Sequence, residues 1–175
     1  MDFVLARETK YGPGGRVVVE RDPSDPGGTT KYGIDQRSHP RIDVASLDRG
    51  EAEEIYYEEK WRRFRCGELK APWDLAVFDA SVNPGEGWVI PNLQRAVGAK
   101  VDGWIGPKTI AAVNAAGNQQ LIEFLRLRCA YYRARPEKIN GRIFRDKYLK
   151  GWLNRVALVA EATLGAEAEE RVMAA

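Results

Sequence analysis

The residues with the clearest capacity for chemistry are a glutamate near the N-terminus and the polar side chains of a loop that follows it. Glu8 ends a short apolar segment, and Asp22, Asp25 and Thr30 lie in the stretch RDPSDPGGTTKYGI, residues 21–34. Its prolines and paired glycines exclude a regular helix or a central strand. An acid on one side of a cleft with an aspartate–threonine pair on the other is what an inverting glycosidase needs. The acid protonates the leaving oxygen, and the pair holds the attacking water.

Each of these residues also has an ordinary structural interpretation. A glutamate at a helix end is most often exposed to solvent, whereas apolar neighbours such as Val4, Leu5 and Tyr11 would favour the protonated form that a general acid needs. Asp-Pro pairs are common in turns. The residue types alone leave both interpretations open.

The elements that must position these residues are mostly helical. Residues 2–9 are expected to form a short helix that is broken by GPGG at 12–15, and the β-branched residues of 16–20 predict a strand. Apolar residues recur at helical spacing in several later segments, at 43–64, 71–83, 90–97, 108–116, 118–134 and 141–162. The fold class expected is mostly α with one small N-terminal β-hairpin.

Five segments, in this order, resemble glycoside hydrolase family 108. They are Glu8, residues 21–34, FDASVNPG at 78–85, LQRAVGAKVDGWIGPKT at 93–109 and KGWLNRV at 150–156. The resemblance runs from about residue 3 to about residue 162. It implies a lysozyme-like fold, with a catalytic part at 1–90 and a helical peptidoglycan-binding-type part at 91–163 packed on it as one unit. The tail at 164–175 is rich in alanine and glutamate and is expected to fray.

The resemblance also implies roles for the first group of residues. Glu8 would be the acid, and Asp25 and Thr30 would position water, with Asp22 as the alternative to Asp25. Where the family has Glu-Gly-Gly-Tyr shortly before the Asp-Pro loop, this chain has a longer stretch, so either an insertion lengthens the hairpin or the acid is lost. We expect an insertion, because FVLARE matches the helix that precedes the acid; Glu20 is the alternative acid.

Candidate substrate-binding residues are Tyr32, Asn83 and Trp61. Tyr32 could stack on a sugar ring or belong to the core, and each tryptophan could be a sugar platform or a core residue. Asn83 lies four residues after Asp79 and so on the same helix face, where it could bind a sugar N-acetyl group. Asp79 could instead be a buried structural acid. The stretch VDGWIGPKT, residues 101–109, is expected to be a packing turn and not a separate wall-binding site.

The implied function is that of a phage or prophage endolysin. Such an enzyme is an N-acetylmuramidase, or lysozyme, that cuts the β-1,4 bond between N-acetylmuramic acid and N-acetylglucosamine in peptidoglycan strands. Two alternatives stay open. One is a lytic transglycosylase, which needs one glutamate and no water-positioning partner. The other is an inactive murein-binding or virion structural protein.

Composition limits the other partners. The net charge of +2 on 175 residues does not indicate nucleic acid. His39 is the single histidine, and Cys66 and Cys129 stand outside any metal-binding motif, so we expect no metal, no cofactor and two free buried thiols. No apolar run is long enough to insert stably in a membrane.

The N-terminus lacks the features of a secretory signal. We therefore expect synthesis in the host cytoplasm, and action on periplasmic peptidoglycan after holin-type release or as part of a particle. We also expect the protein to be a monomer.

Overall fold

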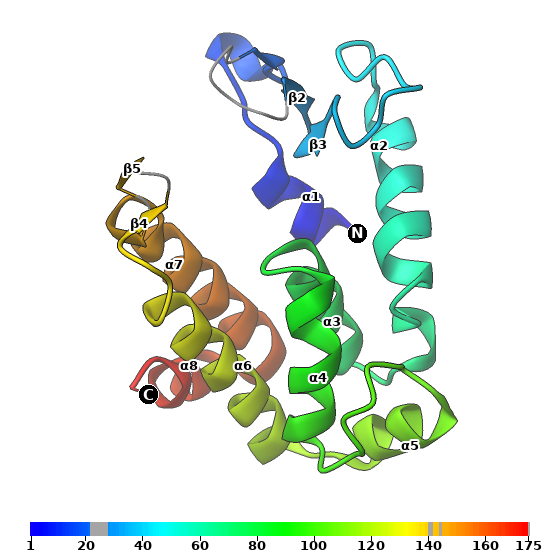
Figure 1. Ribbon diagram of the computed structural model, residues 1–175, viewed down its shortest axis with the longest axis vertical. Coiled ribbons are helices and arrows are strands. Elements are labelled where there is room, and N and C mark those ends of the chain that lie inside the picture. Colours follow the sequence, from blue (N-terminus) through cyan, green and yellow to red (C-terminus); the bar gives the residue numbers. More distant parts are fainter. Residues whose placement is uncertain (22–27, 140–141, 144, 175) are drawn as a thin grey trace. The chain divides into compact units, whose positions relative to one another are not determined.

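The structure is a computed structural model that describes residues 1–21, 28–139, 142–143 and 145–174 (Figure 1). The chain divides into two compact units, Met1–Arg63 and Phe64–Ala175. The division expected from the sequence, between residues 90 and 91, does not coincide with this boundary. It lies inside α4 (Glu86–Ala96), a helix of the second unit. Each unit is described by itself below.

The first unit combines two helical segments with a small antiparallel sheet. Its elements are α1 (Asp2–Glu8), a 3-10 turn η1 (Pro13–Gly15), strands β1 (Glu20–Arg21), β2 (Thr29–Lys31) and β3 (Ile34–Asp35), α2 (Arg49–Tyr56) and its π-helical continuation η2 (Tyr57–Arg62). The strand order is β1-β2-β3, so β2 is the central strand. The expected hairpin is present with a third strand added.

A capping box starts helix α2. The side chain of Asp48 accepts a hydrogen bond from the Glu51 amide at 2.9 Å, and the Glu51 carboxylate accepts one from the Asp48 amide at 2.8 Å. Two of the amides that a helix start leaves unpaired are thereby satisfied. The helix buries Ala52 and Tyr56, and the Tyr56 hydroxyl donates to the carbonyl of Tyr32 at 2.9 Å. The last turn of α2 is therefore tied to the β2–β3 turn.

The segment between α1 and β1 differs from the strand expected at 16–20. Only an isolated bridge joins Tyr11 to Val17, and the chain reverses between them through η1. Gly14 and Gly15 both have positive φ, at 74° and 73°, which turns the backbone back on itself. The pairing after this reversal is limited to that bridge, and β1 begins only at Glu20.

The second unit is helical. It contains η3 (Cys66–Glu68), α3 (Trp73–Val82), α4 (Glu86–Ala96), α5 (Pro107–Ala115), α6 (Asn118–Arg133), the short antiparallel pair β4 (Lys138–Ile139) and β5 (Arg142–Ile143), α7 (Arg145–Leu164) and α8 (Ala166–Met173). Helix α3 is buried on all sides: every residue from 76 to 81 is buried, including the polar residues Asp79 and Ser81. It contacts both α4 and α7, and α6 contacts α4, α7 and α8.

The C-terminal tail at 164–175, which the sequence predicts to fray, is largely helical in the structure. Gly165, with φ at 86°, ends α7, and residues 166–173 form α8, which buries Ala168 and Val172. The Arg126 side chain on α6 donates to the carbonyl of Arg171 at 2.9 Å. Helix α8 contacts both α6 and α7 (Figure 1). Its two buried residues, Ala168 and Val172, are four apart and so lie on one face of the helix.

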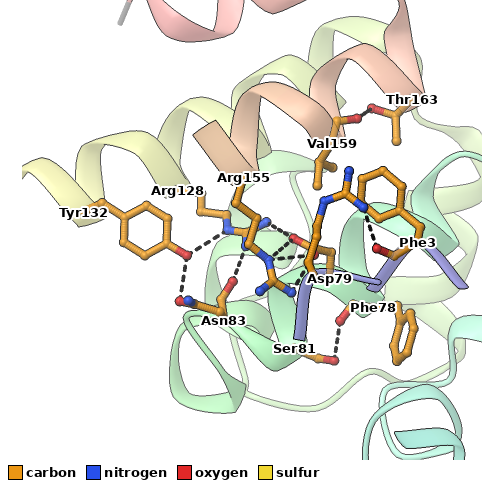
Figure 2. Close-up of polar contacts among 11 residues, drawn as sticks. Phe3, Phe78, Asp79, Ser81, Asn83, Arg128, Tyr132, Arg155, Val159 and Thr163 are labelled. Carbon is orange, nitrogen blue, oxygen red and sulfur yellow. Dashed lines mark hydrogen bonds and ion pairs between the residues drawn. The ribbon is translucent and has the colours of Figure 1, made fainter. Parts of the chain in front are cut away.

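A buried ion-pair cluster joins three helices of the second unit (Figure 2). The Asp79 carboxylate on α3 accepts hydrogen bonds from Arg128 on α6 at 2.7 Å and from Arg155 on α7 at 2.8 Å. Asp79 and Arg128 have fully buried side chains. Burial alone would raise the pKa of Asp79, but the two guanidinium groups hold it below its usual value.

Both cysteines are free and buried, as predicted. Burial raises the pKa of the Cys66 thiol to about 12, so this thiol is protonated and unreactive at neutral pH.

Replacing Asp79 by Asn should destabilise the second unit strongly. The change removes the carboxylate that the Arg128 and Arg155 guanidinium groups both bond, and breaking a buried ion pair in this way costs about 3 kcal/mol. Chemical unfolding at pH 7 measures the loss. Asp146→Asn is the matched control, because its side chain is 58% exposed and forms a surface ion pair with the neighbouring Arg145. An Asp79→Asn protein as stable as this control would contradict the structural role of the cluster.

The same comparison has a defined pH dependence. The folded-state pKa of Asp79 lies below its unfolded value of about 3.9. Its contribution to stability is therefore complete above about pH 4 and is lost as the pH falls through the folded pKa. The difference in unfolding free energy between the original protein and Asp79→Asn should shrink in acid.

Candidate active site

Glu8 is the last residue of α1, and its half-buried side chain lies against the β2–β3 turn. A Cβ atom added to Gly33 would lie 2.8 Å from Oε2 of Glu8 and 2.7 Å from the Tyr56 hydroxyl oxygen. The Glu8 carboxyl group, the Gly33 backbone and the Tyr56 hydroxyl therefore meet at one point. Gly33 leaves this space because it has no side chain.

The turn that contacts Glu8 has a specific backbone geometry. Lys31 pairs with Ile34, so Tyr32 and Gly33 form a two-residue hairpin loop. Both have positive φ, at 55° and 75°, as a type I′ turn requires. The tyrosine accepts this conformation because the Tyr56 hydroxyl bonds its carbonyl. This arrangement places the two-residue turn beside the candidate acid.

The longer segment after Glu8 folds as a separate excursion. The Gly12 amide donates to the Arg16 carbonyl and the Val18 amide to the Lys10 carbonyl, both at 2.9 Å. The excursion leaves Glu8 at the helix end and β1 paired with β2, as expected for an insertion. Glu20, the alternative acid, forms an ion pair with Lys10.

Thr30 lies in the central strand, opposite Glu20 on one side and Asp35 on the other. Directly paired residues point to the same face of a sheet, so Thr30 shares its face with two carboxylates. Asp35 accepts a hydrogen bond from the Ser38 amide at 2.9 Å. Partial burial favours its protonated form, but the hydrogen bonds from Ser38 outweigh this and lower the pKa of Asp35.

Asp35 is a candidate that sequence reasoning missed. It stands just after the quoted stretch and reads as a turn residue. Only the strand register places it beside Thr30. Asp22 and Asp25 lie outside the described residues, and their placement near Glu8 stays a prediction.

A pocket of about 150 Å³ lies along α1. It is lined by Asp2, Leu5, Ala6, Thr9, Tyr11, Tyr32 and Arg49. Tyr11 is 59% exposed, whereas Tyr32 is only 8% exposed. Tyr11 therefore offers more ring surface to a ligand than Tyr32, for which sugar stacking stays a prediction. Trp61, on η2, is half-buried, and its sugar-binding role also stays a prediction.

Asn83 lies in the second unit, at the C-terminal end of α3, beside the Asp79 cluster. Its side-chain oxygen accepts a hydrogen bond from the Tyr132 hydroxyl at 2.9 Å, and its backbone carbonyl accepts one from Arg128. The bond from Tyr132 fixes the orientation of the Asn83 carboxamide, and the bond from Arg128 fixes the backbone of this residue (Figure 2). A pocket of about 210 Å³ opens here, lined by Asn83, Pro84, Tyr131, Tyr132, Arg135 and Trp152.

The described part of the chain contains neither a metal-binding cluster nor a membrane-spanning helix. No group of three or more His, Cys, Asp or Glu side chains there could hold a metal ion. Among the same residues, every helix is too short or too polar to cross a bilayer.

Residues 1–85 match the family model described as "Glycosyl hydrolase 108", and residues 89–157 match the one described as "Predicted Peptidoglycan domain". The structure of Brucella abortus SagA is similar, with a TM-score of 0.69 and 27% identity over 98% of this chain and 90% of that one. A search of curated proteins gave no match.

These findings define a lysozyme-like glycoside hydrolase that acts on peptidoglycan. Residues 1–85, which include Glu8, Thr30 and Asp35, match glycoside hydrolase family 108, and residues 89–157 match a peptidoglycan domain. The expected family and the expected fold class are both confirmed.

The contact between Gly33 and Glu8 leads to a second prediction. Gly33→Ala should lower the rate of peptidoglycan hydrolysis by about 100-fold, because an added methyl group must push Glu8 or the turn away from its position. Gly14→Ala is the matched control: Gly14 has nearly the same φ but nothing within 4 Å of an added Cβ. Both changes should cost about 1 kcal/mol of stability through backbone strain.

Release of reducing ends from purified murein measures the rate. If Gly33→Ala and Gly14→Ala were equally active, the geometry around Glu8 would not matter to the reaction.

Proposed function

We propose that this protein is an N-acetylmuramidase (EC 3.2.1.17) that hydrolyses the β-1,4 bond between N-acetylmuramic acid and N-acetylglucosamine, with Glu8 as general acid. The observation that supports this most directly is the position of Glu8 at the end of α1, against the Gly33 turn and the Tyr56 hydroxyl. All three residues lie in the region that matches the glycoside hydrolase family.

Glu8 would protonate the glycosidic oxygen as the bond to the sugar breaks. A general acid must present a proton at a fixed place, and the contacts of Glu8 with Gly33 and Tyr56 restrict where its carboxyl group can lie. Tyr56 is itself fixed by its bond to the Tyr32 carbonyl. The acid is therefore positioned by a helix end, a two-residue turn and a neighbouring helix.

The attacking water would be held on the face of β2 that carries Thr30. A threonine hydroxyl both donates and accepts hydrogen bonds, so it can orient a water molecule towards a carboxylate base. Asp25 is the base that we propose, with Asp22 as its alternative. Asp35 is a further candidate, because it shares the face of Thr30 and its lowered pKa keeps it ionised.

In the second unit, Asn83 is the residue that we propose for binding an N-acetyl group. Its carboxamide is held by the Tyr132 hydroxyl at the edge of the pocket that contains Tyr131 and Trp152. Arg135, in the same pocket, offers a positive charge for a stem-peptide carboxylate.

Glu8→Gln should abolish the release of reducing ends from murein, with a loss of about 10²–10⁴-fold, because the amide keeps the shape of the side chain but has no acidic proton. Glu20→Gln is the control and should stay near-native, since Glu20 pairs with Lys10. If Glu20→Gln lost activity and Glu8→Gln kept it, Glu20 and not Glu8 would be the general acid.

The products separate the enzymatic alternatives. A muramidase releases a reducing N-acetylmuramic acid end, whereas a lytic transglycosylase leaves a 1,6-anhydro end. Mass spectrometry of the digest tells the two apart. Binding to murein without any cleavage by the unmodified protein would favour an inactive wall-binding or virion structural role.

Asp25→Asn and Thr30→Ala should each lower kcat more than they weaken murein binding. If the pair holds water, it acts mainly in the transition state. Asp22→Asn and Asp35→Asn are the parallel variants, and the largest loss of kcat identifies the base. Asparagine suits turns as well as aspartate does. An aspartate that only forms a turn should therefore tolerate the change to asparagine, whereas the catalytic base should not.

NMR of the first-formed product gives an independent reading of the same step. We expect an inverted anomer, which requires a separation of roughly 6.5–9.5 Å between the carboxyl groups of acid and base. A retained β-anomer would exclude the water-holding role of the pair.

Synthesis in a host cytoplasm, action in the periplasm, a phage or prophage origin and a monomeric state stay predictions. Size-exclusion chromatography with light scattering tests the last of them.

A further inference from the structure

Trp104 is unusual among the tryptophans of this chain because it is 64% exposed. It stands in the loop before α5, and its backbone is firmly held. Its amide donates to the Asp102 carboxylate at 3.1 Å, and its carbonyl accepts from the Gln94 side chain and from the Gly106 amide, both at 3.0 Å. Gln94 is fully buried. A large apolar side chain is thus presented to solvent from a rigid support.

The indole ring lies directly on Gly106. A Cβ atom added to Gly106 would be 2.2 Å from the nearest ring carbon. The φ angle of Gly106 is −93°, which any residue adopts. Glycine is therefore needed here for the close approach of the ring and not for the backbone angle. One face of the indole rests on the backbone.

A pocket of about 370 Å³ adjoins the ring. It is lined by Asp102, Trp104, Gly106, Pro107, Lys108 and Thr109. The Asp102 carboxylate is already engaged, since it accepts from Gln94 at 2.8 Å and from the Trp104 amide. Lys108 is exposed, and no carboxylate pairs with it within the described ranges. The pocket therefore combines an apolar platform with an available positive charge.

We propose that this pocket is an auxiliary binding site for a peptidoglycan strand. The apolar face of an N-acetylated sugar ring would stack on Trp104, and Lys108 would pair with a carboxylate of the stem peptide. The choice of ligand rests on the proposed function and on the position of the pocket within residues 89–157, which match a peptidoglycan domain. The stretch 101–109 is then more than the packing turn that the sequence suggested.

A second binding site on the same chain has a clear consequence. It keeps the enzyme on an insoluble substrate between cleavage events, because rebinding becomes an intramolecular step. Loss of the site should therefore lower activity on intact sacculi more than activity on short soluble glycan fragments, which cannot occupy two sites.

The test measures binding of the full chain to purified sacculi by sedimentation, in a Glu8→Gln background that prevents digestion. Trp104→Ala should weaken binding by about tenfold, the usual effect of removing a tryptophan at the centre of a contact. Trp104→Phe should keep most of the binding. Gly106→Ala should weaken binding although the tryptophan is present, because the added methyl group displaces the ring.

Val101→Ala is the matched control, since Val101 is also exposed in the same segment but does not line the pocket. Binding of Trp104→Ala equal to that of this control would overturn the proposal. So would an equal loss in all of the variants, which would indicate collapse of the loop; circular dichroism and thermal unfolding check for that.

Digestion is followed in the same tubes through reducing ends. Cleavage by the Glu8→Gln protein would count against Glu8 as the acid, while the comparison of Trp104→Ala with Val101→Ala at zero time would still decide the binding site.

Discussion

The second unit depends on one buried carboxylate that faces two guanidinium groups. Asp79 joins α3 to α6 and α7, and a charge of that kind is stable in the interior only while its partners stay in place. Removing Asp79 takes away the carboxylate that both guanidinium groups bond, and removing either arginine breaks one of the two links between helices, so the three helices are held in a single arrangement. The net contribution of such a cluster to stability is often small, but the cost of breaking it is large.

The cluster also determines the surroundings of Asn83. Arg128 uses its remaining donors on the Asn83 carbonyl and on the Tyr132 hydroxyl, which in turn bonds the Asn83 side chain. Polar groups in a buried network restrict one another because each would be costly if left unpaired. The ion pair that closes the bundle therefore also fixes the candidate sugar contact at its edge.

In both units, a glycine lets the side chain of a proposed site residue come unusually close to the backbone. Gly33 admits the carboxyl group of Glu8 and the Tyr56 hydroxyl, and Gly106 admits the ring of Trp104. In each case a larger residue would displace the side chain that the site needs. The match of residues 1–85 to the glycoside hydrolase family defines the class of enzyme, whereas these contacts concern how individual side chains are positioned.

The sequence by itself determined the family, the mostly helical fold, the position of Glu8 at a helix end and the buried free thiols. These features follow from local patterns: helical spacing of apolar residues, glycine and proline at turns, and short motifs in a fixed order.

Only the tertiary structure decided which distant residues meet. Asp79 pairs with Arg128 and Arg155, which lie 49 and 76 residues further along the chain. The packing of α8 and the position of Trp104 likewise depend on neighbours from other helices. No local pattern encodes such pairings, because they arise when separate elements compete for the same buried surface and the same hydrogen-bond partners.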